Sequence, residues 1–462
     1  MKYLHQRSPG IYHLDHRLLP EVRAMLAAMS SRMPKGGIRA RYAEIVEVVA
    51  EDIVRNTMEW AGRDPGSMVV NDVARSRAED RLCEYPLHPK VQGFFDKFVG
   101  QYGHSSIQEQ VGDPAIYIEG ISWMTAWLLF DSPLCRGQEF STRAVRHKDW
   151  PVALEAGDDL RFEALHNDWM TVFMAEVEWW KEHFKSPENR KAAGVADKEP
   201  FRPALDRARW ALPGTISSGL CFTSDIRERA RVIKAGKHLG EPEQPVWTAI
   251  SEAYKKALPG IAPHALRERQ SDKNVPAHLR NLMSPAPRIE RPTSSQGVQV
   301  MPSPSLNPLP LTPYERERRS TYMDPWKNRE GRIALYIECS LAVARDWHRH
   351  RTLYPWTLNT VLDEAGNLQI ASDYAPMSDL ARERAPALWA NSTALWKSFM
   401  GRGDIQKAAL CLPFGTKVAI SGQGGVRDVI YTLELRAYTH GANFEYKRQA
   451  EAALRLLGVQ DK

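Results

Sequence analysis

At 462 residues the chain is longer than one typical domain, so two domains are expected. A hydrophobic content of 43% and a charged content of 26% are typical of a soluble globular protein, and no apolar run is long enough to span a bilayer. The net charge of +6 is compatible with an anionic small ligand but is too weak to indicate nucleic acid. We therefore expect neither a nucleic-acid nor a membrane partner.

The first part of the chain opens with helical patterning. Apolar residues at i, i+3, i+4 and i+7 predict helices within residues 18–33 and 41–62. A short strand followed by a helix-length segment is predicted at 115–131. Further helices are expected at 160–184 and 246–260.

A proline-rich stretch divides the chain. Residues 284–313 carry eight prolines and almost no apolar periodicity, which is typical of an extended linker. We expect a first domain at 1–283, a linker at 284–319 and a second domain at 320–462. The last segment of the second domain, 424–458, predicts one long helix or a broken pair.

The five cysteines are dispersed along the chain and form no Cys-x-x-Cys pair. An odd, scattered set is typical of reduced thiols, and the N-terminus lacks the apolar core of a signal peptide. The expected location is the cytoplasm, and no structural metal site is expected.

An internal repeat links the two domains. AIYIEGISWMTAWLLFD (115–131) and ALYIECSLAVARDWHRH (334–350) align without a gap at first, and both begin Ala-aliphatic-Tyr-Ile-Glu. Each domain later carries a Leu-Pro step, in RWALP (209–213) and ALCLP (409–413). A duplicated domain explains this order better than a chance match.

Each copy lacks polar residues that the other retains. The second copy has Arg-His-Arg at 349–351, where the first has Asp-Ser-Pro at 131–133. The first copy has GQEFSTR at 137–143, and a simple offset matches its Glu139, Ser141 and Arg143 to Thr357, Asn359 and Val361. Such reciprocal loss predicts one active site shared by the two copies.

Together these motifs resemble the flavin-dependent thymidylate synthases. The signature of that family joins an Arg-His-Arg cluster to a Ser-x-Arg run, and here the two parts lie at 349–351 and 137–143. GHSSIQEQ (103–110), RWALP and LRAYTHGANFE (435–445) are similar to further segments of the family. The resemblance touches both domains and leaves out the N-terminal helices and the linker.

The resemblance implies an α+β fold made of two tandem copies of the family fold, with an N-terminal helical extension and a shortened second copy. The implied reaction is the flavin-dependent C5 methylation of dUMP to dTMP. FAD is the implied cofactor, and methylene-tetrahydrofolate and NAD(P)H are the implied co-substrates. Because the family places its nucleotide site between the subunits of a homotetramer, a homodimer of this chain is expected to provide equivalent sites.

The resemblance also assigns roles to individual residues. The implied catalytic residues are His104, Ser141 and Arg143. The implied nucleotide-binding residues are Glu139, Ser141, Arg143, Arg209, Asp346, Arg349 and Arg436. The implied FAD-binding residues are His104, Arg349, His350, Arg351 and His440. Several arginines suit this chemistry because guanidinium groups bind phosphate in a forked geometry and positive charge favours a reduced flavin.

Two departures from the family pattern leave alternatives open. Asp346 stands where the family has glutamine beside the nucleotide, and Ala409 replaces the arginine of the second Leu-Pro step. The first alternative is the same chemistry on another pyrimidine nucleotide, such as hydroxymethylation or a cytosine substrate. The second is a catalytically inactive scaffold that binds nucleotide or flavin. A metal site at His348 and His350 is disfavoured, because residues at i and i+2 diverge on a helix.

Overall fold

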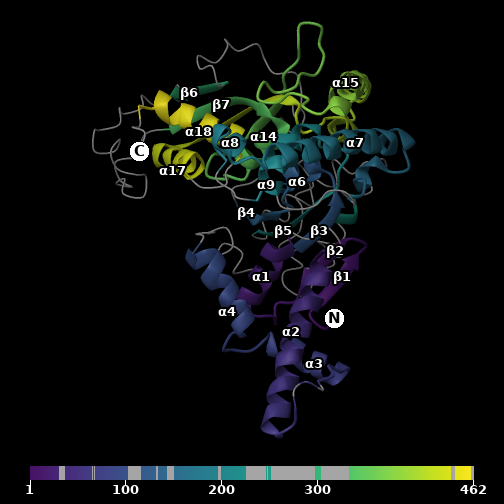
Figure 1. Ribbon diagram of the computed structural model, residues 1–462, viewed down its shortest axis with the longest axis vertical. Helices are drawn as coiled ribbons and strands as arrows, with labels where there is room; N and C mark the ends of the chain where they lie inside the picture. Colours follow the sequence, from purple (N-terminus) through teal and green to yellow (C-terminus); the bar gives the residue numbers. More distant parts are fainter. Residues whose placement is uncertain are drawn as a thin grey trace, which may run out of the picture. The chain divides into compact units, whose positions relative to one another are not determined.

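The structure is a computed structural model with two antiparallel sheets and many helices, so the chain is a mixed α+β protein (Figure 1). It describes residues 1–30, 37–64, 66, 68–101, 116–131, 134–142, 150–195, 199–224, 246, 248–250, 297–302, 332–438 and 443–458. Within these ranges no helix combines the length and apolar character needed to cross a membrane.

The chain forms two compact units, each built from separate stretches of sequence. The first unit comprises Met1–Ser122, Leu134–Glu155 and Ser217–Lys273, and the second comprises Trp123–Pro133, Ala156–Ile216 and Asn274–Lys462. Each sheet lies wholly within one unit.

The first unit contains a five-stranded sheet in the order β1-β2-β3-β5-β4. Its strands are β1 (Leu4–Ser8), β2 (Ile11–Leu14), β3 (Ile116–Ile121), β4 (Cys135–Glu139) and β5 (Ser218–Ser224). Its helices are α1 (Pro20–Ser30), α2 (Gly37–Trp60), α3 (Asp72–Arg81), α4 (Pro89–Phe95) and the π-helix η2 (Asp96–Gln101), with the 3-10 turn η4 (Leu154–Ala156) at the boundary of the two units. Every residue of β5 is buried, as expected for a strand with neighbours on both sides.

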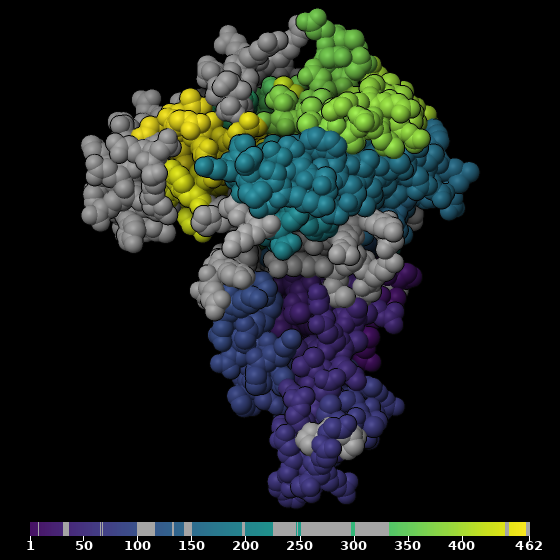
Figure 2. Space-filling model, in the orientation of Figure 1, coloured from purple at the N-terminus to yellow at the C-terminus, as the bar shows by residue number. Residues whose placement is uncertain are grey.

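The second unit contains a four-stranded sheet in the order β6-β7-β9-β8. Its strands are β6 (Val298–Pro302), β7 (Arg332–Ser340), β8 (Thr357–Thr360) and β9 (Lys417–Gly425). Its helices are α6 (Trp123–Phe130), α7 (Leu160–His183), α8 (Pro187–Ala192), α9 (Phe201–Ala208), α14 (Leu341–His348), α15 (Asp379–Gly401), α16 (Ile405–Leu410), α17 (Val426–Ala437) and α18 (Phe444–Leu456), with the 3-10 turn η5 (Arg209–Ala211). Helices α14, α17 and α18 pack on this sheet. The segment of α7 lies beside that of α15, in the teal and light-green parts of Figure 2.

The predicted helices are confirmed where the structure describes them. The patterns at 18–33 and 41–62 correspond to α1 and α2, and the pattern at 160–184 corresponds to α7. Helix α7 begins after Asp159, whose carboxylate accepts from the backbone nitrogen of Arg161, as an N-cap should. The segment 424–458 is the broken pair α17 and α18.

Part of the predicted linker is a strand. Residues 298–302, inside the expected linker 284–319, form β6 and pair with β7. The alternation of Val298 and Val300 with polar Gln299 is a strand signal that the surrounding prolines obscure.

Each of the two sheets contains four strands in the same order and register, so the repeat seen in the sequence extends to the sheets. Strands β2, β3, β5 and β4 correspond in order to β6, β7, β9 and β8. Tyr117 lies opposite Cys221 on β5, and its repeat partner Tyr336 lies opposite Ser421 on β9. We call the first set with α6 the first copy, and the second set with α14 the second copy.

A bulge in β3 shifts the repeat by one residue. The pairing of β3 with β5 changes register between Glu119 and Ile121, and Gly120 adopts a φ of +81°. No such shift interrupts β7. Beyond the bulge, Ser122 is therefore the equivalent of Ser340, and Leu128 of α6 is the equivalent of Asp346 of α14.

The simple offset proposed for β4 and β8 is wrong by one residue. Gln138 lies opposite Cys221, and Thr357 lies opposite Ser421, the residue equivalent to Cys221. Glu139 therefore corresponds to Leu358, so the second copy has an apolar residue where the first has a carboxylate.

Candidate functional site

The predicted site residues fall into three groups. His104, Arg143 and His440 lie outside the described residues. Glu139 and Ser141 belong to the first unit. The second unit holds Arg209, Asp346, Arg349, His350, Arg351 and Arg436.

The second-unit residues gather around the N-terminus and C-terminus of α14. This helix begins after Ser340, whose hydroxyl accepts from the backbone nitrogen of Val343 at 3.3 Å. The buried carboxylate of Glu445 accepts from both the backbone nitrogen of Ser340 (2.7 Å) and its hydroxyl (2.6 Å). Because α18 supplies Glu445, this contact fixes α14 against α18 at the point where the strand becomes a helix.

Arg209 forms a buried ion pair with Asp346. The Arg209 side chain is 1% exposed; its Nη1 lies 3.1 Å from Asp346 Oδ2. Its Nη2 donates to the carbonyl oxygen of Ala342 at 2.6 Å. Both Nη groups are thus occupied by α14, so Arg209 holds this helix and does not present a free fork.

Arg436 is placed differently. Its Nε donates to Nε2 of His350 at 3.0 Å, and its guanidinium lies 5.3 Å from the ring centre of Tyr446. The buried Tyr446 hydroxyl is a further partner, because a hydrogen bond from Arg436 opposes the rise in the Tyr446 pKa that burial causes. The His350 and Tyr446 contacts therefore orient this guanidinium.

The bond from Arg436 fixes the protonation of His350. Since Nε2 accepts, the neutral ring must carry its proton on Nδ1. Burial lowers the pKa of His350 well below 6.5, and the charges of Arg436, Arg349 and Arg351 lower it further against the opposing effect of Asp346. The imidazole therefore stays neutral in a local field that is positive.

Aromatic side chains surround this cluster. The ring centres of Trp347 and Tyr446 are 4.3 Å apart, and those of His350 and Tyr446 are 6.2 Å apart. Trp347 Nε1 donates to Oε1 of the buried Gln449 at 3.0 Å. The Tyr446 hydroxyl lies 3.4 Å from the backbone oxygen of Asp346, which links the Arg209 pair to the Arg436 pair.

Glu139 and Ser141 lie at the end of β4 in the first unit. Glu139 is buried, and its Oε1 accepts from the Ser218 hydroxyl at 3.2 Å. Ser141 is half-buried. The structure thus brings Arg209, Asp346, His350 and Arg436 into one linked cluster, while Glu139 and Ser141 form part of a separate unit.

The sequence did not assign site roles to Tyr446, Glu445 and Gln449. All three are on α18: Glu445 is the last residue of the segment LRAYTHGANFE that resembles the family, and Tyr446 and Gln449 follow it. Three polar residues at i, i+1 and i+4 near a predicted helix start were the available signal, but their burial depends on the sheet beneath them.

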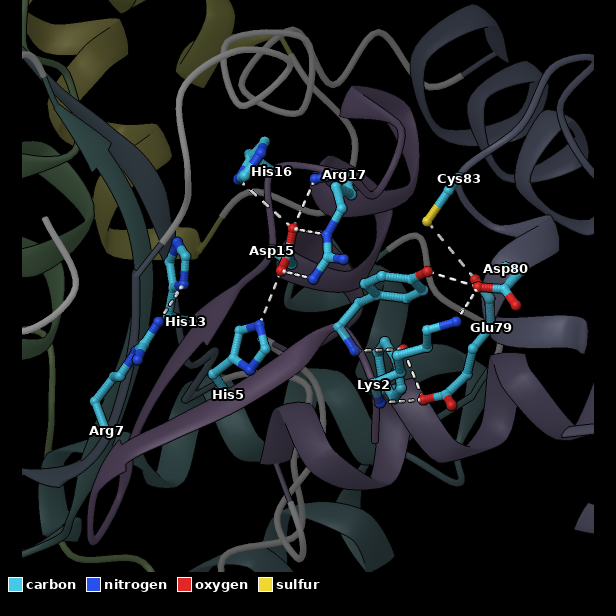
Figure 3. A network of polar contacts seen from close by, with 12 residues as sticks. Lys2, His5, Arg7, His13, Asp15, His16, Arg17, Glu79, Asp80 and Cys83 are labelled. Carbon is cyan, nitrogen blue, oxygen red and sulfur yellow. Dashed lines mark hydrogen bonds and ion pairs between the residues drawn. The ribbon is translucent and has the colours of Figure 1, made fainter. Parts of the chain in front are cut away.

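A second polar network lies at the N-terminus (Figure 3). Asp15 accepts from Arg17 Nε (3.0 Å) and Nη2 (2.8 Å) and contacts His5 Nε2 at 2.9 Å. The Arg17 charge and these hydrogen bonds lower the pKa of Asp15. Lys2 contacts Asp80 at 2.6 Å and so ties the start of the chain to α3. Because the carboxylates of Asp15 and Asp80 bond to other residues of the network, we interpret this network as structural.

Comparisons with known proteins leave the interpretation to the chain's own residues. No model of a protein family matches it, and a search among curated proteins finds no match either.

Proposed function

We propose that this chain methylates dUMP at C5, as a tandem flavin-dependent thymidylate synthase that uses methylene-tetrahydrofolate and NAD(P)H. One observation carries the proposal. Segments that resemble the family supply the linked cluster of Arg209, Asp346, His350 and Arg436, although Arg209 and Asp346 are 137 residues apart in sequence and His350 and Arg436 are 86 apart.

The cluster suits an anionic ligand. Besides its contacts with His350 and Tyr446, the Arg436 guanidinium can donate to the oxygens of a phosphate, a ligand that guanidinium groups favour. Arg349 is exposed one residue before His350 and adds positive charge. A nucleotide monophosphate would relieve the positive field that His350 experiences.

The same cluster fits a flavin, because positive charge and aromatic rings surround the neutral His350. FAD bound there would supply the reducing electrons for the reaction. Arg349, His350 and Arg351 are the residues that would hold it. The role of His350 in this proposal is to keep Arg436 oriented while its proton remains on Nδ1.

Arg209 has a different role here from the one that the resemblance implies. Its ion pair with Asp346 and its bond to Ala342 make it a positioning residue for α14. The pairing also bears on the choice of substrate. Since Arg209 neutralises Asp346, the presence of this carboxylate argues only weakly for a cytosine nucleotide or for hydroxymethylation. The proposed substrate is therefore dUMP.

The first experiment is the visible absorbance spectrum of the purified protein before and after addition of dUMP. An oxidised-flavin spectrum that shifts with dUMP supports the proposal. A flavin spectrum that ignores dUMP but shifts with another pyrimidine nucleotide would favour the first alternative. A colourless protein that cannot be reconstituted with FAD would contradict the enzyme.

A variant pair tests the cluster directly. Arg436→Gln should weaken the dUMP-dependent shift about tenfold or more, because charge-assisted bonds to phosphate are lost. Arg402→Gln is the matched control, since Arg402 donates to Ser398 on α15 and should not affect the shift. Equal dUMP affinity in both variants would remove Arg436 from the site.

The proposed assembly is a cytoplasmic homodimer with sites that combine both copies. All five cysteines are free thiols, as a reducing compartment requires. Arg143→Ala and Arg349→Ala should each abolish turnover. Restored activity on mixing the two inactive proteins would indicate sites built between chains, whereas no rescue would favour sites within one chain.

A further inference from the structure

A second arginine pair in the second unit is not used by the proposed reaction. Arg207 of α9 lies with its guanidinium carbon 3.6 Å from the ring centre of Phe444 and 5.6 Å from that of Trp180. Arg448 of α18 approaches the same Phe444 ring at 5.8 Å. Two guanidinium cations therefore lie within cation–π distance of the same aromatic ring.

Arg207 lacks an acceptor. Among the described residues, no hydrogen bond or ion pair joins its half-buried guanidinium to an oxygen. Burial lowers the pKa of Arg207, and the nearby charge of Arg448 contributes to the same direction. Ring contacts and the more distant charge of Asp206 thus offset the burial of this cation.

The nearby carboxylates have other partners. Asp206, the neighbour of Arg207 in sequence, lies 3.9 Å from Arg209. Asp373 forms an ion pair with Arg448. Glu445 accepts from Ser340. Asp373 therefore pairs with Arg448, and the charges of Glu451 and Asp206 act on Arg448 and Arg207, but within the described part of the chain no carboxylate bonds to Arg207.

A matched arrangement elsewhere in the unit shows the contrast. Arg161 and Arg402 also approach one ring, that of Phe399, at 5.2 and 5.5 Å. There Arg161 makes two bonds to Asp159, and Arg402 donates to the Ser398 hydroxyl at 2.7 Å. Both guanidiniums over Phe399 have acceptors, whereas Arg207 over Phe444 has none.

We propose that Arg207 and Arg448, which both approach the Phe444 ring and whose charges act on each other, form a binding site for a phosphoryl group. This site is separate from the Arg436 cluster and does not depend on the proposed reaction. A planar carboxylate is satisfied by one guanidinium, as Asp15 is by Arg17. A phosphoryl group has oxygens directed in several directions and so suits two guanidiniums that approach from different helices.

The site is accessible to such a ligand. Arg448 is 45% exposed at its side chain, and Arg207 and Phe444 are half-buried. Partial burial strengthens a charge-assisted bond relative to one at an open surface, because water screens it less. Arg448 pairs with Asp373 through Nη2, so part of its fork remains for a ligand.

Calorimetric titration with inorganic phosphate and with pyrophosphate, at constant ionic strength, tests the site. The titration is made in the full-length Arg436→Gln variant, which weakens phosphate binding at the proposed nucleotide site. We expect saturable binding that adding Arg207→Gln weakens about tenfold or more, through loss of a forked donor. Adding Arg402→Gln instead should leave the affinity unchanged.

A more conservative variant guards against misfolding. Arg207→Lys keeps the charge over Phe444 but lacks the fork, and should weaken phosphate binding several-fold while the protein stays folded. Absence of saturable binding in the Arg436→Gln protein would overturn the site. Equal affinity with and without Arg207→Gln or Arg207→Lys would overturn it too, while leaving the proposed methylation untouched.

Discussion

The two copies share a sheet but differ in the helix that follows its central strand. In the first copy all eight residues of α6 are buried, and the helix is apolar except for Thr125. In the second copy α14 carries Arg345, Asp346 and His348 and leads into Arg-His-Arg. Both helices begin directly after a serine whose backbone nitrogen and hydroxyl are held by a glutamate: Glu155 in the first copy and Glu445 in the second.

The difference shows that the scaffold and the chemistry are separable. The serine–glutamate contact recurs although Glu155 follows β4 and Glu445 lies on α18. The glutamate that binds the serine before each helix therefore comes from unrelated positions in the two copies. Charged residues, by contrast, occur within α14 but not within α6. A duplicated fold needs its helix start capped in both copies, whereas it needs a cationic site in one.

The largest expected effect comes from breaking the ion pair of α14. Asp346→Ala should lower the free energy of unfolding by about 3 kcal/mol, because it removes the closer carboxylate from the buried Arg209 charge and leaves Asp206 at 3.9 Å. The double variant Arg209→Leu/Asp346→Leu makes α14 resemble α6, where Leu128 is equivalent, and should recover most of this loss. Urea denaturation measures both; a loss below about 1 kcal/mol for Asp346→Ala would contradict a buried pair.

The serine–glutamate contacts should differ in strength between the copies. Glu445→Ala should cost about 2–3 kcal/mol, because it strips acceptors from the buried Ser340. Glu155→Ala should cost about 1 kcal/mol, since Glu155 is only half-buried. Thermal and urea unfolding of the two variants give the comparison, and a larger loss for Glu155→Ala would reverse our ranking.

The bulge of the first copy can be tested at Gly120. Gly120→Ala should cost about 1–2 kcal/mol, because alanine is strained at a φ of +81° and its Cβ would lie 3.2 Å from Leu154 Cδ1. Gly93→Ala in α4 is the control, with no atom within 4 Å of the added carbon, and should be neutral or slightly stabilising. Equal effects at both positions would argue against strain at the bulge.

The smallest effect concerns pH and the second copy alone. The folded-state pKa of His350 lies below 6.5, so the unfolded chain binds a proton first as the pH falls. Its contribution is therefore complete above about pH 6.5 and decreases by up to about 1.4 kcal/mol per pH unit below it. His350→Gln retains an acceptor for Arg436 and lacks this decrease. The free energy of unfolding of both proteins at pH 7.5 and 5.5 checks this expectation. An equal decrease in the two proteins would exclude His350 as its source.

Sequence periodicity predicted the helices α1, α2 and α7 and both strand–helix junctions, because each depends on a local apolar pattern. The register after Gly120 could not be predicted, since a one-residue bulge leaves an ungapped alignment looking intact. Strand β6 was hidden among prolines. In each case the missing information is the pairing of a strand with its neighbour, which the local sequence does not contain.

For the candidate site, the sequence identified the arginines but not their different states. Arg209 and Arg436 both lie in segments that resemble family motifs, yet Arg209 forms an ion pair with Asp346 and bonds to Ala342, whereas Arg436 contacts the neutral side chains of His350 and Tyr446. That distinction depends on the packing of α9, α14 and α17 together. No spacing along the chain separates a structural arginine from one that faces a ligand.

The two Leu-Pro steps have a consequence for how the chain could be divided. Within the second unit, Phe414 nitrogen donates to Leu212 oxygen and Gly415 nitrogen to Trp210 oxygen, both at 2.8 Å. A Cβ on Gly214 would lie 2.2 Å from Leu412 oxygen, so this approach requires glycine. A protease cut between residues 303 and 331 should therefore yield two fragments that remain associated until they are denatured. When the two fragments are made as separate chains, they should fold well only if they are co-expressed.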